Sequence, residues 1–198
     1  MTERNIKEYA ALYSYVILDN MRLTISVLTK NEIFWDLSKD DWYTVMQEFL
    51  FYNMNVCGRF TFSWFGVETG EVIMDKMFAE IGSTIDKNRE KLLDAKLDSL
   101  TMQNFSDYLT TLGNAQHSDQ LRNLYNQRAV EYSKYDLIRE DNSKGFAGLL
   151  SWEFAEKVAA LLNRPHNDAP FLMSIYTVGA HLSLNIVKTR EIWDGRKR

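Results

Sequence analysis

The sequence contains little cysteine, proline or glycine. Among 198 residues there are one cysteine, Cys57, two prolines and nine glycines. A single cysteine excludes an intrachain disulfide, so the fold is not a disulfide-stapled scaffold. Domains built from many short strands need turns about every ten residues, and glycine and proline commonly supply them. Their scarcity therefore disfavours a β-rich fold.

The chain also lacks a long apolar run and a strong excess of charge. Its longest apolar run, from Tyr9 to Leu18, is interrupted by Ser14 and is too short to cross a bilayer. Polar residues of mixed charge open the sequence, so we expect no signal peptide. The net charge of −4, from 23 basic and 27 acidic side chains, disfavours a nucleic-acid-binding face. We therefore expect a soluble cytoplasmic protein with no membrane span and no nucleic-acid partner.

Hydrophobic residues, by contrast, are plentiful at 45%, and aromatic residues make up 13%. They recur at the three- and four-residue spacing of amphipathic helices, most clearly from Ile6 to Leu28 and from Trp42 to Cys57. No repeat or linker divides the chain. The sequence thus predicts an all-α fold, a single compact bundle of about six to eight helices over residues 1–198. Residues 195–198 are expected to form a frayed basic tail.

Four local signals set expected helix boundaries. Ser38 is placed to cap a helix, with Asp41 three residues later and an apolar staple of Leu37 against Trp42. Gly58 can end or kink that helix, after which the residues from Phe60 to Phe65 fit either a helical turn or a short strand. A short helix is expected from Thr101 to Gly113. The Asn-Asp-Ala-Pro sequence at 167–170 predicts the start of the last helix.

Side chains suited to catalysis or metal binding are sparse. None of the three histidines has Glu three residues before it, and no His-Glu-x-x-His motif occurs, so we expect no metal and no cofactor. His181 falls within the apolar last helix, where a core histidine hydrogen-bonded to a neighbouring helix is favoured over a catalytic one. Cys57 is interpreted as a packed thiol rather than a nucleophile. The acidic residues Glu68, Glu71 and Asp75 fit an acidic first helical turn better than a cation site.

Aromatic side chains between 42 and 65 are too numerous for one helix face. A single stripe accommodates about three or four residues every two turns, and this segment supplies more. An ordinary large core is one explanation, and a subunit interface or an apolar ligand cavity is the other. The residues that we assign to such an interface or ligand site are Phe49, Tyr52, Phe60, Phe62, Trp64, Phe65 and His181.

These observations predict a function without naming a ligand. We expect a non-catalytic helical protein that binds an apolar small molecule or a protein partner and associates with itself, as in a homodimer. The alternative is an enzyme with an acid/base site formed by His181 and a carboxylate. A polar cleft that brings His181 beside Asp or Glu would favour the enzyme, whereas an apolar cavity or face would favour binding.

Overall fold

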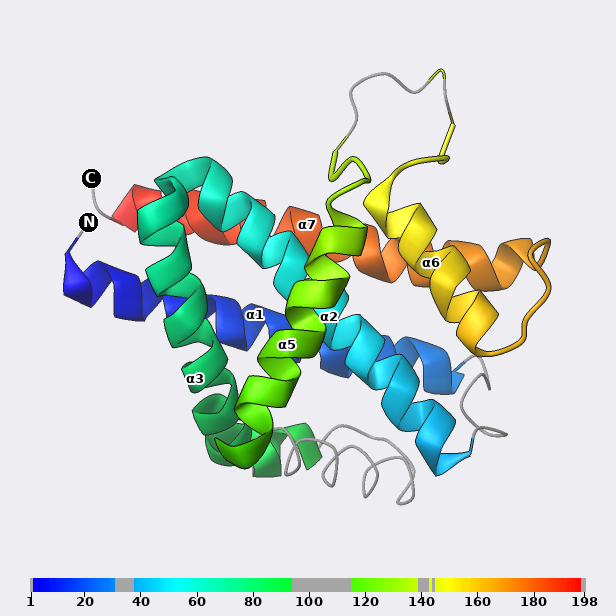
Figure 1. Ribbon diagram of the computed structural model, residues 1–198, viewed down its shortest axis with the longest axis horizontal. Coiled ribbons are helices and arrows are strands. Elements are labelled where there is room, and N and C mark those ends of the chain that lie inside the picture. The colour runs from blue at the N-terminus through cyan, green and yellow to red at the C-terminus, as the bar shows by residue number, and fades with distance from the viewer. Residues whose placement is uncertain (1, 31–37, 94–114, 139–142, 144, 197–198) are drawn as a thin grey trace.

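The computed structural model describes residues 2–30, 38–93, 115–138, 143 and 145–196. It confirms the predicted all-α class, because these residues contain six helices and no strand, with only an isolated bridge between Asp136 and Leu149. The helices are α1 (Glu3–Lys30), α2 (Lys39–Phe65), α3 (Val67–Leu93), α5 (Ala115–Tyr132), α6 (Leu150–Leu161) and α7 (Ala169–Arg196) (Figure 1).

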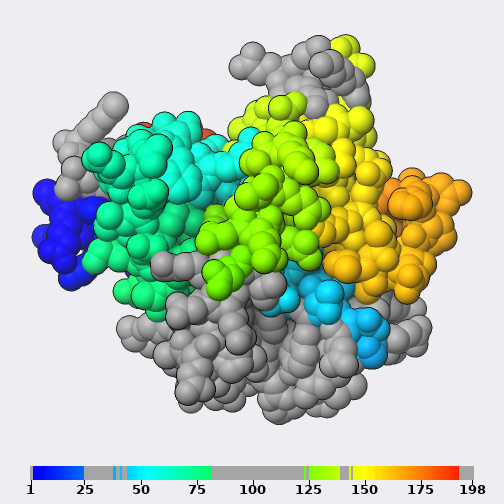
Figure 2. Space-filling model, viewed as in Figure 1, coloured from blue at the N-terminus to red at the C-terminus, as the bar shows by residue number. Residues whose placement is uncertain are grey.

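Helix α2 is the centre of the bundle. It contacts α1, α3, α5, α6 and α7, and α5 crosses over its middle in both the ribbon and the space-filling view (Figures 1 and 2). Every residue from Phe49 to Gly58 is buried, on all sides of the helix. A helix that is apolar all round is stable only when other helices surround it, and the arrangement of the five neighbours meets that requirement.

The N-terminal boundary of α2 follows the predicted cap. The Ser38 hydroxyl oxygen accepts a hydrogen bond from the Asp41 backbone N–H at 3.1 Å, and the hydroxyl donates to the Asp41 carboxylate at 2.6 Å. This reciprocal pair satisfies one of the free N–H groups of the first turn. The staple of Leu37 against Trp42 lies outside the described side chains.

At its other end α2 differs from the prediction, since it continues through Gly58 to Phe65. The strand interpretation of Phe60–Phe65 is therefore wrong. A Cβ atom on Gly58 would lie 3.1 Å from Tyr125 Oη and 3.2 Å from Met74 Cε, so the glycine permits close packing of α2 against α5 and α3. The helix ends instead at Gly66, whose φ of 77° is readily adopted by glycine.

The last helix begins where the Asn-Asp-Ala-Pro sequence predicts. The Asp168 carboxylate accepts a hydrogen bond from the Phe171 backbone N–H at 3.2 Å, and Pro170 lies in the first turn. Helix α7 extends to Arg196, so the first two residues of the expected frayed tail are helical. Lys197, Arg198 and the helix expected from Thr101 to Gly113 lie outside the described residues.

Helix α7 also bears on the expectation that no segment spans a membrane. Its portion Ala169–Glu191 is long and apolar enough to do so by length and composition. A core helix of a soluble protein meets the same criterion, and α7 packs against α6, α1 and α2.

Candidate functional site

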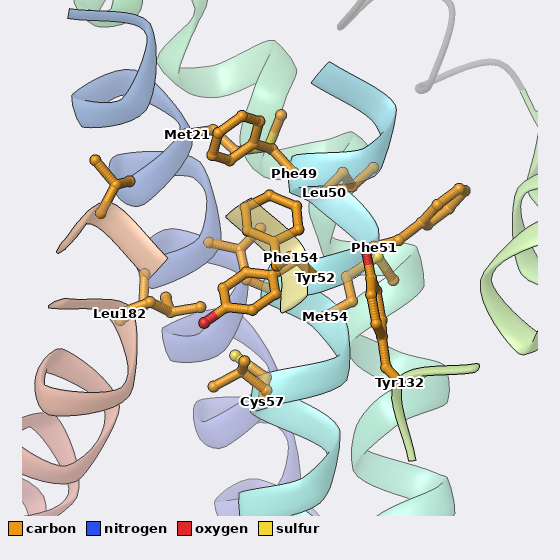
Figure 3. Packing of buried hydrophobic residues seen from close by; sticks show 14 of the residues in the cluster. Met21, Phe49, Leu50, Phe51, Tyr52, Met54, Cys57, Tyr132, Phe154 and Leu182 are labelled. Atoms are coloured by element: carbon orange, nitrogen blue, oxygen red, sulfur yellow. The ribbon is translucent and has the colours of Figure 1, made fainter. Parts of the chain in front are cut away.

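The first half of the predicted aromatic site is part of the protein core. Phe49 and Tyr52 are almost fully buried, and both contact Phe154 of α6, with ring centroids 4.8 Å and 4.2 Å apart (Figure 3). Phe60 is also buried. All three belong to α2, which five other helices contact, so they lie inside the bundle.

The second half of that site lies nearer the surface, at the end of α2. Phe62 is 37% exposed, while Trp64 and Phe65 are half-buried. The Arg190 guanidinium of α7 lies 4.2 Å from the centroid of the Trp64 ring and 5.6 Å from that of Phe65. These cation–π contacts tie the end of α2 to the end of α7, so Trp64 and Phe65 already have a partner within the chain.

His181 does not occupy the core position expected of it. It is exposed on α7, and no described residue forms a hydrogen bond or ion pair with it. Val178 and Leu182, four residues apart, lie on the buried face of α7, and His181 lies on another face of the helix. The described residues contain no group of three His, Cys, Asp or Glu side chains suited to a metal.

Cys57 and the acidic residues of α3 are the other side chains that the sequence offers for nucleophilic catalysis or cation binding. Cys57 is completely buried, and burial raises the pKa of its thiol well above the usual range. A buried neutral thiol is a poor nucleophile, which supports the packing interpretation. Glu68, Glu71 and Asp75 are exposed on the first turns of α3.

A groove of about 600 Å³ lies along α7, away from the predicted aromatic residues. One wall comes from the segment before α6 and from the first turn of α6, and the other comes from one face of α7. The groove is mostly apolar, with a few polar groups. Its lining residues are Leu137, Ile138, Leu149, Ser151, Tyr176, Ala180, Ser183, Leu184, Val187, Lys188 and Glu191.

Backbone hydrogen bonds fix the wall that precedes α6. The Asp136 N–H donates to the Gly148 carbonyl at 2.9 Å, and the Leu150 N–H donates to the Asp136 carbonyl at 2.8 Å. These bonds close the base of the segment that carries Leu137 and Ile138. Arg59 of α2 adds a further tie by donating to the Tyr135 carbonyl at 2.7 Å.

An aromatic cluster of three residues supports the same wall. The ring of Phe146 stacks on Trp152 of α6 with centroids 5.1 Å apart and packs against Tyr176 of α7 at 5.0 Å. Trp152 and Tyr176 are 6.1 Å apart. Because Tyr176 itself lines the groove, this cluster joins the groove wall to α6 and α7.

The polar groups of the groove lie at distinct places along it. Ser151 is in the first turn of α6, and Ser183 is in the middle of α7. Lys188 and Glu191 follow Ser183 by five and eight residues along α7, which is about 8 Å and 12 Å farther along the axis. The serines and the charged pair therefore mark different parts of the groove.

A charge cluster around the buried Glu48, which we call the Glu48 cluster, joins α2, α5 and α6. Glu48 is 3% exposed, and its carboxylate contacts Lys157 at 3.1 Å and Arg128 at 3.1 Å. It also accepts a hydrogen bond from the Tyr132 hydroxyl. The Glu131 carboxylate forms ion pairs with Lys157 at 2.8 Å and with Arg128 at 3.2 Å. Two anions and two cations thus neutralise one another, which is typical of a structural cluster.

Comparison of the chain with known protein families, curated proteins and solved structures gave no match.

Proposed function

We propose that this protein is a non-catalytic binding protein whose ligand is an apolar small molecule held in the groove along α7. The observation that carries the proposal is the groove itself. Its volume of about 600 Å³ lies in the range of small-molecule sites, about 300–1,000 Å³. Such sites are mostly apolar with a few placed polar groups, and this lining has that character.

A small ligand fits the surface better than a large protein partner does. The exposed large apolar side chains of the described residues are distributed over α1, α2, α3, α5, α7 and the segment before α6. A stable dimer buries about 800 Å² of each partner in one continuous patch. We propose self-association only for the surface at the end of α2, where the Phe62 side chain is exposed.

The enzyme alternative has less support. It requires a carboxylate beside His181, and among the described residues none lies within ion-pair distance of that imidazole. His181 also lies outside the lining of the groove. We propose instead that the protein acts through binding, in solution in the cytoplasm.

Filling the groove tests the proposal. N-phenyl-1-naphthylamine, a neutral probe whose fluorescence rises in apolar surroundings, is titrated into the native protein and into Ala180→Phe. We expect saturable binding to the native protein and at least a tenfold loss in Ala180→Phe, because the new ring occupies the groove. Thr177→Phe is the control, since Thr177 is exposed on the same helix and does not line the groove.

Absence of saturable binding to the native protein would contradict the proposal, as would equal binding to Ala180→Phe. Sedimentation equilibrium of the native protein and of Phe62→Ala tests self-association separately. A native dimer that Phe62→Ala dissociates would support an interface at the end of α2, and a native monomer at the highest concentration tested would exclude one.

A further inference from the structure

Two serine hydroxyls in the groove lack the partners that serine normally has. Ser151 is 9% exposed and lines the groove, yet no described residue forms a hydrogen bond with its hydroxyl. Ser183 lines the same groove and is likewise without a partner among the described residues. Neither oxygen is among the buried unpartnered atoms of the described residues, so both are open to the groove, where a ligand atom can bond to them.

Other hydroxyls on helices of this protein show the usual arrangement. Ser174 and Thr177 of α7 donate to the carbonyls four residues before them, at 2.9 Å and 2.7 Å. Ser14 of α1 and Thr61 of α2 do the same. Ser151 and Ser183 differ from these four residues, because their hydroxyls have no partner among the described residues and both line the groove.

The first turn of α6 adds a backbone N–H donor close to the Ser151 hydroxyl. Leu150 and Trp152 donate their N–H groups to the carbonyls of Asp136 and Leu149, but the Ser151 N–H has no acceptor among the described residues. The cap residue, Leu149, has no side-chain oxygen to fill that role. A ligand atom that accepts hydrogen bonds is thus offered both a hydroxyl and a backbone N–H from one residue.

The charges around the groove balance one another. The Glu153 carboxylate lies in the first turn of α6 and accepts the Gly148 N–H at 2.8 Å, so it offsets the positive end of the helix dipole. Farther along α7, Lys188 and Glu191 carry opposite charges. Both lie farther along α7 than Ser183, so no charged lining residue is placed at the serine end of the groove to hold an ionic head group.

We infer that the ligand is a neutral amphipathic molecule, such as a fatty alcohol, ester or amide. Its uncharged polar head accepts hydrogen bonds from Ser151, with Ser183 beside it, and its apolar chain lies along Leu184 and Val187. This inference rests on the proposed function and adds the chemical class of the ligand.

Three probes with the same ten-carbon chain test it: 1-decanol, decanoate and decyltrimethylammonium, each measured by isothermal titration calorimetry. We expect 1-decanol to bind about tenfold more tightly than either charged probe, because a charged head loses solvation without gaining a counter-charge. Ser151→Ala should weaken 1-decanol binding roughly two- to tenfold, the effect of one hydrogen bond. It should leave both charged probes unchanged.

Ser174→Ala is the control, because it removes a hydroxyl from α7 that already has a partner within its own helix. Tighter binding of decanoate than of 1-decanol would overturn the inference, and so would an equal effect of Ser151→Ala and Ser174→Ala. In both cases binding of the neutral fluorescent probe, and its loss in Ala180→Phe, would still support the groove as a ligand site. Loss of all binding to the native protein would instead overturn the proposed function as well.

Discussion

Gly179 of α7 lies against the hydroxyl end of Tyr52 of α2. A Cβ atom on Gly179 would be 2.9 Å from Tyr52 Oη and 3.1 Å from Tyr52 Cζ. The Tyr52 ring is itself held between two others, stacked on Phe154 at 4.2 Å and edge-on to Tyr132 at 6.3 Å (Figure 3). The absence of a side chain at 179 therefore allows the two helices to approach with Tyr52 between them.

Gly179→Ala is expected to destabilise the protein, although alanine is the better helix former. The gain in helix propensity is about 1 kcal/mol, whereas overpacking a filled core costs typically about 1–3 kcal/mol. Urea unfolding should thus show a lower free energy of unfolding for the variant. Tyr52→Phe removes only Oη, so it should reduce the effect of Gly179→Ala in a double-mutant cycle. A variant more stable than the native protein would show that the Tyr52 ring moves aside freely.

The sequence predicts where the helices lie along the chain better than it predicts which helices pack around one another. Helical spacing is a local property, and the Ser38 cap depends on residues three apart, so both are readable from the chain alone. That α2 is central depends on five other helices, which no local pattern specifies. For this reason the sequence leaves open whether the aromatic surplus forms a large core, an interface or a ligand cavity, whereas the structure buries Phe49, Tyr52 and Phe60 in the core.

The candidate site could not be predicted for a related reason. Its walls join Leu137 and Ser151 to residues of α7 that lie 25 or more positions later. The course of the segment before α6 also depends on hydrogen bonds between Asp136 and the backbone of Gly148 and Leu150, which are distant in sequence. Apolar residues of α7 face both ways, with Leu182 buried and Leu184 57% exposed. Spacing alone therefore does not show which face of α7 carries His181. Glu48, by contrast, is recognisable in the sequence as an acidic residue between the apolar residues Val45 and Phe49.

Glu48→Gln should be among the most destabilising single changes in the protein. It removes the buried charge of the cluster and leaves Lys157, which is 18% exposed, and Arg128 with one counter-charge between them. Breaking a fully buried pair costs about 3–5 kcal/mol. We expect about 2–3 kcal/mol here, because solvent reaches Arg128 and Glu131, which are 40% and 39% exposed. Urea unfolding measures the loss. Glu8→Gln is the control, since the Arg4–Glu8 pair is exposed at the surface and such pairs contribute about 0–1 kcal/mol.

A loss below about 1 kcal/mol for Glu48→Gln would contradict this account, because it would place the cluster in solvent-like surroundings.

Stability should fall steeply in alkaline solution because buried tyrosines cannot ionise while the protein is folded. Burial, and then the Glu48 carboxylate, raises the pKa of Tyr132 far above its usual value, and burial raises the pKa of Tyr52 and Tyr125. The unfolded chain releases these protons near pH ~10, so above that pH it binds fewer protons than the folded chain. The free energy of unfolding then decreases with pH, by up to about 1.4 kcal/mol per pH unit for each tyrosine.

Urea unfolding between about pH 9 and pH 11 measures the slope. The buried tyrosines should ionise only when the protein unfolds, so their phenolate absorbance should rise together with unfolding and not before it. The measurement is best made in Cys57→Ala, since the buried thiol also has a raised pKa and would add its own dependence from pH ~8.5 upward. A flat profile over this range would mean that the tyrosines are accessible in the folded protein.

Phe49→Ala and Phe62→Ala separate the two explanations of the aromatic segment. Phe49 has no exposed surface and meets Phe154 edge-on at 4.8 Å, whereas Phe62 is 37% exposed on the same helix. Truncating a fully buried phenylalanine costs about 3–5 kcal/mol. Phe62 is different because its ring covers Gly70 of α3, where a Cβ atom would lie 2.4 Å from Phe62 Cδ1. We therefore expect a loss of about 1 kcal/mol for Phe62→Ala, within the range of ordinary substitutions.

Both free energies of unfolding should be measured at two protein concentrations well apart. If the segment is core, the loss in Phe49→Ala is the same at both concentrations, because no association is linked to folding. If Phe62 belongs to a subunit interface, the native protein gains stability with concentration and Phe62→Ala abolishes that gain. Nearly equal losses for the two variants, independent of concentration, would contradict the central position of Phe49, since its ring is fully buried whereas that of Phe62 is 37% exposed.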